Sequence, residues 1–131
     1  MHAFLVELDN KPGGLAAIGE ALGSRGINIE NIAGSACGSS GRVTIQTSDD
    51  AGTRQALGAL GLKVDEMEIV EASLAHQPGS LGKAARRLAD AGVNIESILP
   101  TGMSGGEVTV GFVTNNPAKT REVLSTVATQ G

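Results

Sequence analysis

The sequence contains an internal repeat, and this repeat limits the possible folds more than any other feature. Residues 11–32 align with residues 77–98 without a gap at an offset of 66 positions, and nine of the 22 aligned positions are identical. The identical pairs are Pro12/Pro78, Gly13/Gly79, Leu15/Leu81, Leu22/Leu88, Gly26/Gly92, Asn28/Asn94, Ile29/Ile95, Glu30/Glu96 and Ile32/Ile98. Because twice this offset spans almost all 131 residues, we predict two copies of one unit, residues 1–66 and 67–131.

The first half of each copy carries a strand signal followed by a helix signal. Apolar residues alternate over residues 4–8, which is typical of a strand with one buried face. A Pro-Gly pair then precedes apolar residues at helical spacing, namely Leu15, Ile18 and Leu22, and Leu81 opens the matching pattern in the second copy. We therefore expect a strand, a Pro-Gly loop and an amphipathic helix at the start of each copy.

The second half of each copy carries a hairpin signal. Glycine-rich turns at 37–41 and 104–107 are followed by VTI at 43–45 and by VTV at 108–110. Apolar runs on both sides of such turns predict paired strands. Residues 62–66 supply a fourth strand in the first copy.

A second helix is expected near residue 50 and near residue 116, so the predicted order is β-α-β-β-α-β. This order defines an α+β unit whose antiparallel sheet has both helices on one face. Only residues 128–131 follow the last helix, so the fourth strand of the second copy is expected to be short or absent. Either a partner chain or the neighbouring copy would then cover the incomplete sheet edge.

Composition and charge exclude several classes of function. The net charge is −4 and there is no Trp or Tyr, whereas nucleic-acid binders normally combine a basic surface with stacking aromatic residues. No apolar run approaches the roughly 18 residues that span a bilayer, and the N-terminal segment lacks the features of a signal peptide. A lone Cys37 cannot form an intrachain disulfide. We therefore expect a soluble cytoplasmic protein that binds neither nucleic acid nor membrane.

The repeated loop between the first strand and the first helix is the strongest chemical feature. It reads DNKPGGL at 9–15 and AHQPGSL at 75–81. A helix N-terminus presents unpaired N–H groups and a partial positive charge, and neither first turn contains an acidic residue that would neutralise it. The N–H groups of residues 13–15 and 79–81 therefore suit a carboxylate or another small anion. The alternative interpretation is that Pro-Gly only starts a helix.

A second repeated polar residue, Asn28 or Asn94, opens the second strand of each copy. Within one copy it lies at the opposite end of the first helix from the Pro-Gly loop. Two copies side by side would bring Gly13 near Asn94 and Gly79 near Asn28. An asparagine amide offers a donor and an acceptor, which suits the zwitterionic head of an amino acid. The alternative is a turn asparagine that satisfies only local backbone.

The pattern D-x-x-P-G-x-L…G-[IV]-N-I-E-x-I, present twice with the first position varied in the second copy, resembles the ACT domain family over essentially the whole chain. The resemblance implies two ferredoxin-like units and regulatory binding of a small amino acid at an interface between paired units. Leu8 and Leu74 depart from the polar residue that some serine-binding members carry there. The expected ligand-binding residues are Asn10, Gly13, Gly14, Leu15, Asn28, Ile29, His76, Gly79, Ser80, Leu81, Asn94 and Ile95.

No arrangement of residues indicates an enzyme. The nucleophile and base candidates, Cys37, His2 and His76, have no spacing that requires them to meet, and no metal-ligand motif or Walker lysine is present. We expect no catalytic residue, metal or cofactor. The function hypothesis is an amino-acid-binding regulator that forms a homodimer. The alternative is a regulatory subunit that binds no ligand and docks on an enzyme of amino-acid metabolism.

Overall fold

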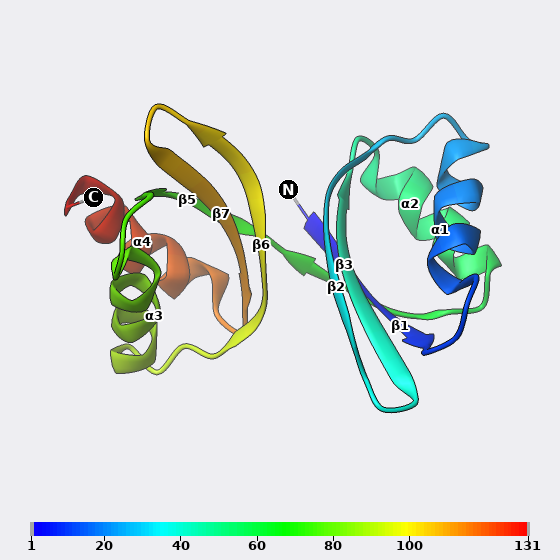
Figure 1. The fold of residues 1–131 in the computed structure, drawn as a ribbon, viewed down its shortest axis with the longest axis horizontal. Coiled ribbons are helices and arrows are strands. Elements are labelled where there is room, and N and C mark those ends of the chain that lie inside the picture. The colour runs from blue at the N-terminus through cyan, green and yellow to red at the C-terminus, as the bar shows by residue number, and fades with distance from the viewer. Residues whose placement is uncertain (1, 131) are drawn as a thin grey trace. The chain divides into compact units, whose positions relative to one another are not determined.

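The computed structural model describes the backbone of residues 2–130 and the side chains of residues 2–125. The chain divides into two compact units, residues 2–67 and 68–130. In each unit the helices pack against one face of an antiparallel sheet, as predicted (Figure 1).

The first unit has the complete β-α-β-β-α-β order. Its elements are β1 (His2–Asp9), α1 (Gly14–Gly23), β2 (Ile29–Cys37), β3 (Ser40–Thr47), α2 (Asp50–Ala59) and β4 (Lys63–Glu68). The sheet order is β2-β3-β1-β4, so β1 lies inside the sheet and the two edges are β2 and β4. The core between sheet and helices consists of Phe4, Val6, Ile18, Leu22, Ile27, Val43, Ile45, Ala56 and Leu57.

Over the described residues, the second unit repeats this order without the fourth strand. Its elements are β5 (Val70–Ala75), α3 (Ser80–Asp90), β6 (Ile95–Ser104), β7 (Glu107–Thr114) and α4 (Pro117–Gln130). The three-stranded sheet has the order β5-β7-β6, so β5 is an edge strand in the described part of the chain. Helix α4 has 14 residues against 10 in α2, and it extends over the residues left for a fourth strand. The predicted short or absent strand is therefore explained by a longer helix.

The repeat is interrupted by one extra residue in β6. Phe4 pairs with Ile45 in the first unit, and Val70 pairs with Phe112 in the second, so the offset grows from 66 to 67 between paired strands. The β6–β7 register shifts between Pro100 and Gly102, which marks a one-residue bulge at Thr101.

The bulge corrects one sequence comparison. The segment VTI at 43–45 corresponds in the structure to 110–112, not to VTV at 108–110. The hydroxyl oxygen of Thr101 is buried without a hydrogen-bond partner among the described residues, which fits its position outside the regular ladder.

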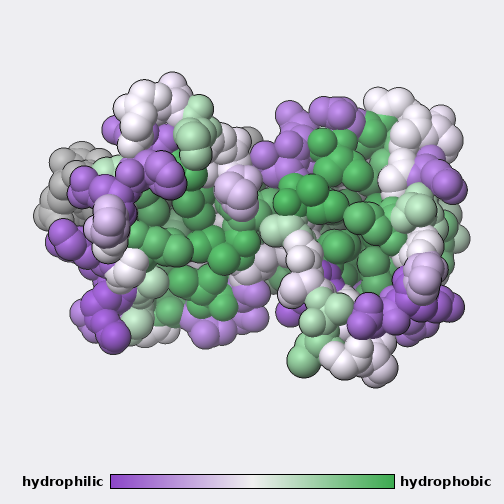
Figure 2. Space-filling model, viewed as in Figure 1, coloured by the Kyte–Doolittle hydropathy of each residue, from purple (hydrophilic) through white to green (hydrophobic). Residues whose placement is uncertain are grey.

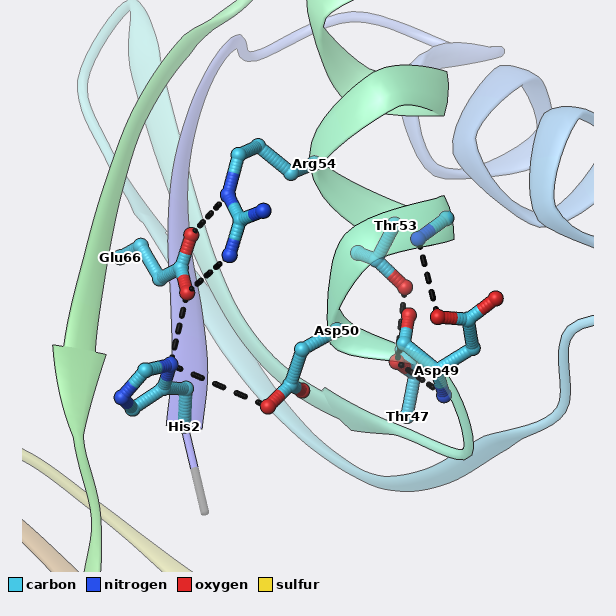
Figure 3. A network of polar contacts seen from close by, with 8 residues as sticks. His2, Thr47, Asp49, Asp50, Thr53, Arg54 and Glu66 are labelled. Atoms are coloured by element: carbon cyan, nitrogen blue, oxygen red, sulfur yellow. Dashed lines mark hydrogen bonds and ion pairs between the residues drawn. The ribbon is translucent and has the colours of Figure 1, made fainter.

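Each unit also contains a buried pair of threonines between its third strand and its second helix. Thr47 Oγ1 lies 2.7 Å from Thr53 Oγ1 in the first unit (Figure 3), and Thr114 Oγ1 lies 2.7 Å from Thr120 Oγ1 in the second. The two hydroxyls of each pair share one hydrogen bond, so the strand and the following helix are joined by a buried polar contact.

Candidate functional site

The repeated Pro-Gly loop has the same backbone form in both units. The residue before each helix is a glycine with positive φ, 98° at Gly13 and 91° at Gly79. Glycine adopts this left-handed conformation without a Cβ clash, which explains why both copies carry it. Neither helix has an acidic residue in its first turn. Both helices therefore begin where the sequence predicts, and no acidic side chain neutralises their N-terminal N–H groups.

A backbone hydrogen bond joins each loop to the hairpin of its own unit. The N–H of Asn10 donates to the carbonyl oxygen of Ser39, and the N–H of His76 donates to that of Gly106, both at 2.9 Å. In the first unit the side chain of Asn10 also donates to the carbonyl oxygen of Gly38, at 2.8 Å. The Asn10 side chain therefore has a partner within its own unit, and His76 is exposed.

The loop of the second unit borders a cavity of about 360 Å³. This volume lies at the low end of the roughly 300–1,000 Å³ that small-molecule pockets occupy. Three predicted ligand residues, His76, Ser80 and Leu81, line the cavity. The other lining residues are Leu74, Ala75, Gln77, Ile98, Leu99, Pro100, Val108 and Val110. Five of these come from β6 and β7, which approach the loop only in the folded unit, and the other three belong to β5 and to the loop itself.

The cavity opens beside hydrophobic side chains that remain exposed. Leu81 is 50% exposed and Ile98 is 38% exposed, and Figure 2 shows hydrophobic residues at the surface of each unit. The helical spacing placed Leu15 and Leu81 in the same stripe as buried residues, but both are half exposed because they lie at the first turn of their helices.

The repeated asparagines lie where the second strands begin, and their backbones are held locally. The N–H of Asn28 donates to Ser48 Oγ at 3.0 Å, and the N–H of Asn94 donates to Asn115 Oδ1 at 3.0 Å. Both residues are exposed. The side chain of Asn94 donates to Glu96 Oε1 at 3.2 Å, so this carboxamide has a partner in the protein itself.

Within a unit, the loop and the asparagine are kept apart by the helix between them. Helix α1 has 10 residues and is therefore about 15 Å long. Ile29 and Ile95 pack partly buried against the cores of their units. The expected pairing of Gly13 with Asn94, and of Gly79 with Asn28, stays a prediction.

Cys37, His2 and His76 are the nucleophile and base candidates in the sequence, which predicts no metal site. Cys37 is exposed at the end of β2. Across the described residues, no group of three or more His, Cys, Asp or Glu side chains is placed to hold a metal ion. None of the described helices has the length and apolar character needed to cross a bilayer.

The most connected polar group in the first unit joins β1, α2 and β4 (Figure 3). Arg54 Nε and Nη2 donate to the two carboxylate oxygens of Glu66 at 2.6 and 2.8 Å, and His2 Nδ1 lies 2.6 Å from Glu66 Oε2. Asp50 Oδ2 is 3.8 Å from the same His2 nitrogen. Hydrogen bonding from Arg54 is the main cause that lowers the pKa of Glu66 to about 2.

This network predicts an acid-dependent loss of stability. Because Glu66 has a lower pKa in the folded protein than its usual 4.5, its contribution is complete above about pH 4.5 and is lost as pH falls towards 2. In urea unfolding between about pH 2 and pH 6, Glu66→Gln should be less stable than the parent at the upper end and converge with it at the lower end. Glu20→Gln, at an exposed position of α1, should not show this convergence. A constant difference between Glu66→Gln and the parent would contradict the assignment.

Comparison with known proteins agrees with this architecture. Residues 2–61 match the sequence model of the ACT domain family, and no curated protein matches the chain. Protein BT0572 from Bacteroides thetaiotaomicron is 26% identical, with a TM-score of 0.78 over 95% of this chain and 86% of that chain. The regulatory subunit of aspartate kinase from Thermus thermophilus is 23% identical, with a TM-score of 0.65 over 96% of this chain and 91% of that chain.

A second regulatory subunit of aspartate kinase, from Thermus flavus, is 23% identical, with a TM-score of 0.66 over 98% of this chain and 91% of that chain. These likenesses extend over both units, beyond the residues that match the family model. The chain therefore carries an ACT domain at residues 2–61, followed by a second ACT-like unit with the partial order β-α-β-β-α.

Proposed function

We propose that this protein is a non-catalytic regulator that binds a small amino acid through the repeated Pro-Gly loops. The observation that carries this proposal is the cavity at the β5–α3 loop, because three residues expected to bind the ligand line it. Two of the structural relatives are regulatory subunits of aspartate kinase, which agrees with a regulatory role.

The ligand's carboxylate would bind the N–H groups at the start of the helix. In the second unit the N–H of Ser80 already donates to the carbonyl oxygen of Gln77 at 3.3 Å, so Gly79 and Leu81 are the main donors that we propose there. The carboxamides of Asn28 and Asn94, delivered by a paired unit of a homodimer, would bind the rest of the head group. A few charge-assisted hydrogen bonds, less the cost of ordering, correspond to a dissociation constant of roughly micromolar to millimolar.

Thermal unfolding with each of the twenty amino acids tests this function. A ligand present at about 100 times its Kd should stabilise the protein by about 2.7 kcal/mol, and the increase in Tm should be reduced in Asn28→Ala or Asn94→Ala. Because both asparagines are exposed, these substitutions should leave the stability of the unliganded protein nearly unchanged.

The second candidate function is a docking subunit without a ligand of its own. It is favoured by the same two relatives, which are subunits of an enzyme. If no amino acid changes the Tm while an enzyme of amino-acid metabolism co-purifies with the chain, the docking function is supported and the amino-acid-binding function is contradicted.

A further inference from the structure

The two Pro-Gly loops differ in the space beside them. In the first unit, methyl carbons of Leu8 lie 3.5 and 3.8 Å from the position that a Cβ on Gly14 would occupy, so Leu8 packs directly over this glycine. In the second unit the corresponding residues, Leu74 and Ser80, both line the cavity. Leu8 therefore contacts the glycine position of its own loop, whereas in the second unit the corresponding two residues border a cavity.

The polar side chains of the two loops also differ: one is bound within its own unit, and the other lines the cavity. Asn10 donates to the carbonyl oxygen of Gly38 and so closes the first loop onto its hairpin. Its counterpart His76 lines the cavity of the second unit together with Gln77 and Ser80. These three side chains can donate hydrogen bonds to an anionic group, and none of the described residues that line the cavity is acidic.

Aliphatic side chains make up the rest of the wall. Leu74, Leu81, Ile98 and Val108 come from four elements, and Pro100 precedes the β6 bulge. A wall of this kind gains free energy from burying carbon atoms of a ligand and gives no partner to a polar ligand side chain. The cavity therefore matches a molecule with a carboxylate at one end and a short hydrocarbon group at the other.

We infer that the cavity of the second unit binds a carboxylate with an aliphatic side chain, with His76 at the carboxylate, and that the loop of the first unit does not bind this ligand. This inference rests on the proposed function and specifies the ligand class and the unit that binds it. An aliphatic amino acid and its 2-oxo acid share this chemistry, and they differ only in the group beside the carboxylate.

Isothermal titration calorimetry of the full chain tests the ligand class. The probes are leucine, 4-methyl-2-oxopentanoate, isoamylamine, serine and lysine. We expect leucine or its 2-oxo acid to bind at least tenfold more tightly than serine or lysine, and isoamylamine, which has no carboxylate, to show no binding. The tighter of the first two identifies the source of the ligand.

Matched variants test which unit binds. Leu81→Ser and Ile98→Ser alter the cavity, and Leu15→Ser and Ile32→Ser alter the corresponding positions of the first unit, where exposure is 50% and 42%. We expect at least a tenfold increase in Kd for the first pair and less than a twofold change for the second. All four sites are exposed, and circular dichroism verifies that each variant is folded.

A smaller change is expected when His76 is replaced. His76→Ala should raise the Kd several-fold, and Asn10→Ala should leave it unchanged. Tighter binding of serine or lysine, or equal effects of the variants in both units, would overturn this inference and leave the proposed amino-acid function standing. No binding of any amino acid would overturn both.

Discussion

Replacing Phe112 by alanine is expected to lower the free energy of unfolding by about 3–5 kcal/mol. Phe112 is fully buried in the core of the second unit, where it is paired with Val70 on β5 and with Ile98 on β6. Removing the ring from this central strand loses apolar burial and leaves a cavity that neighbouring side chains cannot fill completely.

The measurement is urea unfolding followed by far-ultraviolet circular dichroism, since the chain has no Trp or Tyr for intrinsic fluorescence. Met103→Ala is the matched control, because Met103 lies in the same sheet but is 69% exposed. The control should change stability by less than about 0.5 kcal/mol. A loss below about 1 kcal/mol for Phe112→Ala would show that this residue is not central to the core.

Two glycine-to-alanine substitutions three residues apart should change the free energy of unfolding in opposite directions. Gly79 has a φ of 91°, so Gly79→Ala should cost about 1–2 kcal/mol. Gly82 lies inside α3, and a Cβ there would meet nothing within 4 Å. Gly82→Ala should therefore stabilise the protein by about 0.5–1 kcal/mol, because alanine loses less conformational freedom on helix formation.

The same method measures both variants, and their difference is the informative quantity. We expect Gly82→Ala to exceed Gly79→Ala by about 1.5–3 kcal/mol in free energy of unfolding. Gly13→Ala and Gly19→Ala form a similar pair in the first unit, where Gly13 has a φ of 98° and Gly19 lies in α1 with nothing within 4 Å of a Cβ built there. Stabilisation by Gly79→Ala would contradict the left-handed conformation of this loop.

The sequence was sufficient to predict the order of elements, because its signals are local. Alternating apolar residues, the Pro-Gly pair and the glycine turns each depend on neighbours along the chain, and the structure confirms the fold they predict. The bulge at Thr101 was missed because an extra residue in a strand is visible only against its partner strand. As a result, VTV at 108–110 was aligned with the wrong segment of the first unit.

The candidate site was predicted only along the loop. His76, Ser80 and Leu81 were found because they repeat a pattern, but the opposite wall comes from β6 and β7, more than ten residues away in sequence. The sequence also did not reveal that Asn10 and His76 differ in their contacts. Asparagine and histidine are both acceptable in such a turn. Only the folded structure shows that the Asn10 side chain donates to the carbonyl oxygen of Gly38.

The extra residue in β6 also limits how the halves of this protein can be recombined. If Thr101 entered the ladder as an ordinary strand residue, the residues after it would be displaced by one position against β7. A displacement by one position turns every following side chain to the opposite face of a sheet. A chimera that crosses from β3 into β7 must therefore follow the 67-residue offset, because joining residue 42 to residue 109 would shift the rest of the strand by one position.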